Sequence, residues 1–187
     1  MLSAVVDHAL PSARNETRDL PHWVYHLLTV AGIGLAVAAL AVFGLTLEGL
    51  AAAVFCLALA IVTAADLEYR LIPDRVVLPA TAIVLPLQTI ADPSPEWALA
   101  ALGACGALFL LALVYPAGMG MGDVKLALLM GAALGRSVIA ALVLATFLSA
   151  IPAIAILVRH GRAGRTMGFP FGPFLAAGSI VVLFATA

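Results

Sequence analysis

Charged residues are scarce in this sequence of 187 residues, and their scarcity excludes most soluble folds. Only 10% of the residues are Asp, Glu, Lys or Arg, whereas 64% are hydrophobic. A soluble domain typically has about 25% charged and about 45–50% apolar residues. A chain this short cannot enclose such an apolar excess, because small domains keep much of their surface in contact with water. We therefore expect a membrane protein.

The sequence also has little cysteine and no excess of basic residues. Cys56 and Cys105 lie in apolar runs and form no CxxC pair, so the sequence indicates neither a disulfide framework nor a zinc site. The formal net charge of −1 does not suggest a nucleic-acid partner. Alternating polar and apolar stretches are missing as well, which argues against an all-β fold. We predict no bound metal and no cofactor.

Long apolar stretches account for most of the chain. A helix needs roughly 20 apolar residues to cross a bilayer. We therefore predict an all-α, polytopic transmembrane helical bundle of about seven spans, at residues 24–45, 50–66, 76–91, 97–116, 124–135, 138–158 and 169–187. The fifth stretch, about 18 Å long as a helix, is too short to cross squarely. We expect it either to begin inside the membrane together with residues 118–123 or to lie where the bilayer is thinned.

The distribution of basic residues predicts how the bundle is oriented. If the spans alternate in direction, the basic residues on one side are Arg14, Arg18, Arg70, Arg75, Lys125, Arg159, Arg162 and Arg165. Arg136 falls on the other side, with the acidic residues Glu48, Asp92 and Glu96. Cytoplasmic loops carry the excess of Lys and Arg. The N-terminus is thus expected in the cytoplasm and the C-terminus outside.

Two segments at the predicted cytoplasmic boundary place an aspartate beside an apolar helix. Asp66 ends the second span and Asp123 begins the fifth. An ionisable residue at a membrane span is by default a functional candidate. Structural roles are equally open at this point, since Asp66 can pair with Arg70 one turn later and Asp123 can cap a helix. For Asp74, just before the third span, we predict a helix-capping role.

The residues before Asp123 favour a functional site. Gly118, Gly120 and Gly122 form a backbone without side chains, which an extended peptide can approach closely. Two aspartates on one face of a membrane can activate water against an amide bond: one takes the proton of the water and the other protonates the carbonyl oxygen. Two close carboxylates share one proton, as this reaction requires.

Three motifs of the sequence resemble those of the prepilin peptidases, or type IV leader peptidases, which are aspartyl proteases of the GxGD type. They are Asp66-Leu-Glu-Tyr-Arg-Leu-Ile-Pro-Asp74 with Leu78-Pro79, then Gly118-Met-Gly-Met-Gly-Asp-Val-Lys125, and finally Pro170-Phe-Gly-Pro-Phe-Leu-Ala-Ala-Gly178. Together the motifs cover the chain from about residue 50 to its end. The resemblance implies that Asp66 and Asp123 are the catalytic pair of an aspartic endopeptidase.

The resemblance also implies a substrate and an organisation of the chain. The substrate is a precursor of a type IV pilin or pilin-like secretion subunit, whose short basic leader is cut off at the cytoplasmic face of the bacterial inner membrane. Residues 1–22 are then a cytoplasmic segment, 23–48 an additional transmembrane helix, and 49–187 the peptidase domain with six helices. Longer members carry a CxxC-containing zinc loop and methylate the product. Only about four residues, Thr46–Gly49, join the first two spans here, so we expect peptidase activity without methylation.

Several further residues are candidates for binding the substrate. The glycines Gly118, Gly120 and Gly122 are expected to lie along the peptide, while Glu68 and Asp74 attract the basic leader. Lys125 is included because a cation in the first turn of a helix is unfavourable, so we expect it to have a specific partner, either a carboxylate or a lipid headgroup. The expected partners of the protein are pilin-like precursors and membrane lipids.

Two other functions use the same residues. Aspartates in membrane helices also relay protons, so a small proton-coupled transporter is one alternative. The acids lie at one face rather than at mid-membrane, and paired broken helices in matching halves are missing, which disfavours it. The other alternative is an assembly subunit that binds pilin precursors without cutting them. Cleavage of a precursor, and its loss on substitution of either aspartate, separates the three functions.

Overall fold

The computed structural model describes residues 21–115, 119–160 and 170–187. Within these ranges the chain forms seven α-helices, one short 3₁₀ helix and no strand. They are α2 (His22–Phe43), α3 (Leu47–Tyr69), α4 (Asp74–Ala91), α5 (Glu96–Val114), α6 (Met121–Leu134), η2 (Gly135–Ser137), α7 (Val138–His160) and α8 (Gly172–Ala185). Each of the seven predicted spans corresponds to one α-helix, so the predicted all-α fold is confirmed.

Most of these helices are suited to a membrane. Five helical stretches of the described chain are long and apolar enough to cross one: Trp23–Phe43, Leu47–Tyr69, Asp74–Ala91, Glu96–Val114 and Met121–Arg159. The last of them runs through α6, the turn at η2 and α7. Helix α8 is equally apolar but has only 14 residues. The architecture is therefore that of a polytopic helical membrane bundle.

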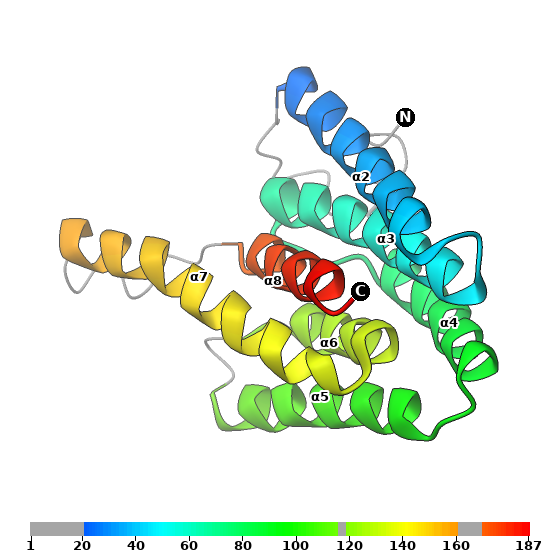
Figure 1. Cartoon of the computed structure of the whole chain (residues 1–187). Helices are drawn as coiled ribbons and strands as arrows, with labels where there is room; N and C mark the ends of the chain where they lie inside the picture. Colours follow the sequence, from blue (N-terminus) through cyan, green and yellow to red (C-terminus); the bar gives the residue numbers. More distant parts are fainter. Residues whose placement is uncertain (1–20, 116–118, 161–169) are drawn as a thin grey trace.

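Helix α6, the predicted span that seemed too short, is the centre of the core. It has 14 residues and a length of about 21 Å. Its side chains Leu126, Leu129 and Met130 are completely buried, and Figure 1 shows the helix between α5 and α8. A helix that is apolar all round is typical of a buried position. Residues of α6 thus contact other helices along most of its length.

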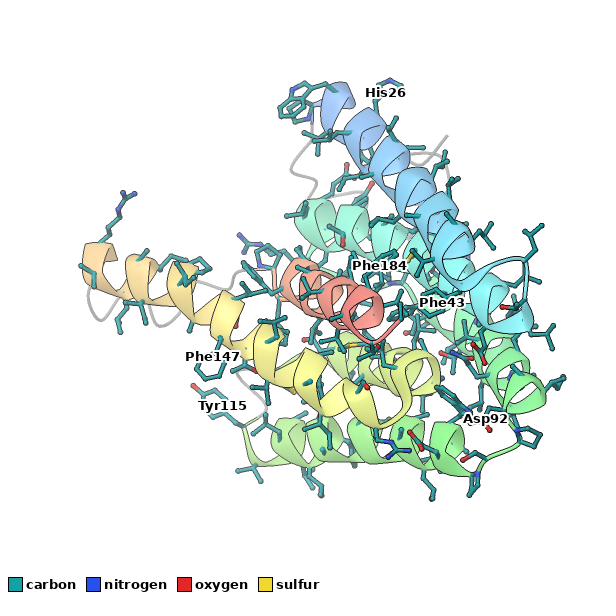
Figure 2. The ribbon with its side chains drawn as sticks, viewed as in Figure 1. His26, Phe43, Asp92, Tyr115, Phe147 and Phe184 are labelled. Carbon is teal, nitrogen blue, oxygen red and sulfur yellow. The ribbon has the colours of Figure 1, made fainter. Side chains whose placement is uncertain are left out.

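Consecutive helices run in alternate directions, which separates the charged residues into two groups. Arg70 follows the end of α3 and Lys125 is the fifth residue of α6, at the same end of the bundle as Asp66 and Asp123. At the opposite end, Glu48, Asp92, Glu96 and Arg136 line a cavity of about 370 Å³. Figure 2 labels Asp92 there, where α4 ends before α5 begins. This separation agrees with the alternation expected from the sequence.

A close contact with α7 fixes the position of α8. At Gly178 in α8, a Cβ atom would lie 2.7 Å from the carbonyl oxygen of Ala141 in α7, so the two backbones are nearly in contact. Small residues allow helices to approach this closely in membranes. Helix α8 also packs on α3 and α6, and Figure 1 shows it lying across the middle of the bundle. Its first residue, Gly172, is thereby held beside the last turns of α3.

Candidate active site

Asp66 lies in the last turn of α3, which continues to Tyr69. The helix ends there because Arg70 adopts a left-handed conformation with φ of +52°. The side chain of Asp66 is buried, and its Oδ2 atom accepts a hydrogen bond of 2.7 Å from the backbone N–H of Gly172. A backbone donor at a helix N-terminus stabilises a carboxylate. The partner of Asp66 is therefore the start of α8, and no ion pair with Arg70 occurs in the described residues.

Asp123 lies in the first turn of α6. The helix begins after Gly120, and the Oδ2 atom of Asp123 accepts a hydrogen bond of 3.3 Å from the N–H of Gly120. This bond is one half of a capping box, since glycine has no side chain to supply the other half. The side chain of Asp123 is half-buried. Asp123 therefore caps the start of α6, one of the two roles that its sequence position left open. Only its Oδ2 atom takes part in this bond, so its Oδ1 atom is available for other contacts.

The two aspartates lie near each other although they are far apart in the sequence. The carboxyl groups of Asp66 and Asp123 are close enough to interact electrostatically. The start of α6 is pressed against the connection between α3 and α4, because a Cβ atom at Gly122 would be only 2.7 Å from Cβ of Ile72. Like charges held this close repel each other.

An ion pair joins the starts of α4 and α6 beside the aspartates. Nζ of Lys125 lies 2.5 Å from Oδ2 of Asp74. Asp74 therefore supplies the carboxylate partner expected for Lys125. The capping role predicted for Asp74 is wrong: the cap position of α4 is Pro73, and Asp74 is the first residue of the helix. A carboxylate in the first turn is favoured by the helix dipole, and here it also neutralises Lys125.

The other predicted site residues lie in different environments. Glu68 is buried in the last turn of α3. Gly120 is exposed and extended, with φ of −82° and ψ of 148°, whereas Gly122 is already inside α6. Gly118 lies outside the described residues. Among the described residues, no three His, Cys, Asp or Glu side chains are close enough together to hold a metal ion.

Gly172 is the residue of the site that sequence reasoning missed. Its segment, Pro170-Phe-Gly-Pro-Phe174, was recognised as a motif but received no role. The missed signal was a glycine between two prolines at the start of an apolar stretch. Such a glycine often marks a close approach to another part of the chain, and a Cβ atom at Gly172 would lie 2.8 Å from Oδ2 of Asp66.

Comparison with known proteins identifies the group to which this arrangement belongs. The family described as "Type IV leader peptidase family" matches residues 53–158, a range that includes Asp66 and Asp123. The chain belongs to the type IV leader peptidase family. The resemblance of its motifs to that family is thus confirmed by a match over more than half of the chain. Gly172 and the rest of α8 lie beyond the matched range.

Two curated relatives of the type IV leader peptidase family are similar to the chain. The "Prepilin leader peptidase/N-methyltransferase" of Bacillus subtilis (strain 168) is 35% identical over 142 residues, which are 74% of this chain and 57% of the relative. The protein of the same name from Burkholderia pseudomallei (strain 1026b) is 33% identical over 168 residues, 86% of this chain and 54% of the relative. The chain spans about half the length of these relatives. No solved structure matches it.

Proposed function

We propose that this protein is a membrane aspartic endopeptidase that removes the leader from precursors of type IV pilins or pilin-like secretion subunits. Asp66 and Asp123 are the catalytic pair. The observation that carries the proposal is their common position at one end of the bundle: Asp66 comes from the end of α3 and Asp123 from the start of α6, where Gly122 packs against Ile72 in the connection that follows α3. The two relatives described above are named "Prepilin leader peptidase/N-methyltransferase".

The reaction needs two carboxyl groups in different protonation states. The ionised one removes a proton from water, which attacks the carbonyl carbon of the scissile peptide bond, and the protonated one gives its proton to the carbonyl oxygen. The repulsion between Asp66 and Asp123 favours the state in which the pair holds one proton. The titration then belongs to the pair and not to either residue.

We further propose where the substrate lies. The cleaved segment runs along Gly120, whose backbone is exposed and extended beside Asp123. Two of the residues predicted to bind the substrate, Asp74 and Lys125, form an ion pair with each other. We expect these two residues to position α6. Glu68 stays a candidate for attracting the basic leader from its place near Asp66.

The orientation of the bundle belongs to the same proposal. The end that carries Asp66 and Asp123 also carries Arg70, Arg75 and Lys125. Basic residues mark the cytoplasmic side. The active site therefore faces the cytoplasm, in the inner membrane of a bacterium, where the leader of a newly made precursor is accessible.

Cleavage by the purified protein tests this function. The protein is reconstituted in liposomes with a prepilin precursor that has a basic leader and an apolar helix, and the product is measured by mass spectrometry. Asp66→Asn and Asp123→Asn each abolish cleavage, because each removes one carboxyl group of the pair. Asp92→Asn is the matched control, since Asp92 is an exposed aspartate at the opposite end of the bundle.

Each outcome of this experiment separates the proposal from the alternatives. Cleavage that persists in either catalytic variant refutes the assignment of the pair. Wild-type protein that binds the precursor but never cuts it indicates an assembly subunit. Wild-type protein that neither binds nor cuts, and moves protons across the liposome membrane, indicates a transporter.

A further inference from the structure

We infer that Gly172 is a positioning residue for Asp66, and that the start of α8 thereby belongs to the catalytic apparatus. This inference rests on the proposed function. It assigns a role to the segment Pro170-Phe-Gly-Pro-Phe174, which the catalytic pair itself does not explain. The contact joins two residues separated by 106 positions in the chain.

The first argument is the hydrogen bond. The N–H of Gly172 donates to Oδ2 of Asp66 across 2.7 Å, and both residues are buried. Gly172 is the first residue of α8, so its N–H is one of those that a helix leaves without an internal partner. Asp66 satisfies this donor, and the donor in turn holds one particular oxygen of Asp66.

The second argument is steric. A Cβ atom at position 172 would lie 2.8 Å from Oδ2 and 3.2 Å from both Cβ and Cγ of Asp66. Contacts of 2.8 Å are too short for carbon and oxygen that are not bonded. Any other residue at 172 therefore pushes the Asp66 side chain aside. Glycine is required here because the backbone of α8 approaches the carboxylate directly.

The third argument is the rigidity of α8. Pro173 is the second residue of the helix, where its fixed φ favours helix initiation. Further along, the close contact of Gly178 with Ala141 holds α8 against α7. The donor N–H of Gly172 thus sits on an element that is itself held in place, as a positioning group should be.

These contacts imply that the two oxygens of Asp66 have different roles. Oδ2 is occupied by the N–H of Gly172. Oδ1 accepts no hydrogen bond from the described residues, which leaves it as the oxygen that acts on the water or the scissile carbonyl in the proposed reaction. Loss of the Gly172 bond lets the carboxylate rotate, so fewer molecules present Oδ1 in the productive orientation.

The decisive variant replaces the backbone N–H without adding atoms. Glycolic acid at position 172 converts the peptide bond into an ester, which removes the N–H donor. A matched ester at Leu175 removes another N–H of the same helix, one that donates to the carbonyl of Phe171 and does not touch Asp66. The two proteins lose the same kind of group from α8 and differ only in the partner of that group.

The ester at 172 lowers kcat for precursor cleavage about tenfold to a hundredfold, because small displacements of a reacting group have effects of that size, and KM is unchanged. Gly172→Ala has the same effect through the steric contact. The ester at Leu175 leaves kcat within about twofold of the wild type. Equal losses of kcat for the two esters, or full activity of the ester at 172, overturn the inference.

A second measurement does not depend on activity. In the protein in detergent micelles, the amide proton of Gly172 has a downfield NMR shift because it is bonded to a carboxylate. Asp66→Ala moves this resonance upfield and leaves the amide of Leu175 in place. An unchanged Gly172 resonance overturns the inference even if cleavage is seen. A shifted resonance in a protein that cleaves nothing supports the contact and contradicts only the proposed function.

Discussion

At the scale of single residues, the distance between a glycine and the atoms of the neighbouring helix or loop determines whether a side chain fits at that position. Gly122 shows this at the start of α6, where a Cβ atom would lie 2.7 Å from Cβ of Ile72. Gly103 in α5 is the opposite case, with nothing within 4 Å of the same atom. Both are glycines in helices of one apolar sequence, and hydropathy does not distinguish them.

Gly122→Ala is expected to destabilise the protein by about 1–3 kcal/mol, the usual cost of overpacking, and to lower the cleavage rate because it displaces α6 beside Asp123. Thermal unfolding in detergent and the cleavage assay measure the two effects. Gly103→Ala is the control and is expected to be neutral or slightly stabilising. Adding Ile72→Gly, which removes the overlapping Cβ atom, restores part of the stability of Gly122→Ala. A Gly122→Ala protein as stable and active as the wild type contradicts the packing argument.

At the scale of helices, ion pairs join elements whose order in the sequence does not make them neighbours. Asp74 and Lys125 connect α4 with α6, and Glu96 and Arg136 connect α5 with η2 through hydrogen bonds of 3.0 and 2.8 Å. The helices themselves follow from the apolar stretches. Their exact ends do not, since the predicted second span ends at residue 66 while α3 continues to Tyr69. Helix ends depend on backbone conformations such as that of Arg70, and hydropathy does not report these.

A double-mutant cycle of Asp74→Asn and Lys125→Gln tests the pair between α4 and α6. The side chains are partly exposed, 33% for Lys125 and 51% for Asp74, so we expect a coupling energy of no more than about 1 kcal/mol. Each single variant lowers kcat, and the double variant lowers it no further, because either change releases the start of α6. If the losses of stability and of kcat in the double variant equal the sums of those in the two single variants, the two residues act independently and the prediction is wrong.

The other ion pair supplies the control for this cycle. Glu96→Gln removes the charge that pairs with Arg136 at the opposite end of the bundle. We expect a similarly small loss of stability and no change in kcat. A fall in kcat for Glu96→Gln as large as that for Lys125→Gln would mean that any loosened helix impairs the enzyme, and the special role of the α4–α6 pair would be lost.

At the scale of the whole molecule, the two ends of the bundle differ in charge. At the end with Asp66 and Asp123, the basic residues Arg70, Arg75 and Lys125 lie among the acids. At the other end, the acids Glu48, Asp92 and Glu96 line a cavity together with Arg136. The alternation of helix directions, which the prediction from the basic residues assumed, places these residues at opposite ends. The membrane side on which each end lies is part of the proposed function.

Cysteine labelling tests that orientation. In a background with Cys56→Ala and Cys105→Ala, single cysteines are introduced by Leu71→Cys, between α3 and α4, and by Asp92→Cys, after α4. Both positions are exposed. A membrane-impermeant thiol reagent added to intact spheroplasts is expected to label the cysteine at 92 and to label the cysteine at 71 only after the membrane is opened. The reverse pattern, or labelling of both in intact cells, refutes the proposed orientation.

The sequence by itself determined the helical bundle, the approximate position of every span and the two candidate aspartates. Apolar stretches must form helices in a bilayer because every backbone N–H and C=O needs a partner within the segment. An aspartate beside such a stretch is a functional candidate because charged groups are unfavourable in a membrane. Only the tertiary structure decided that α6 is enclosed by protein, that Lys125 binds Asp74, and that Gly172 holds Asp66. These contacts join residues far apart in the chain, and they depend on how closely helices approach, which the spacing of residues along a single sequence does not specify.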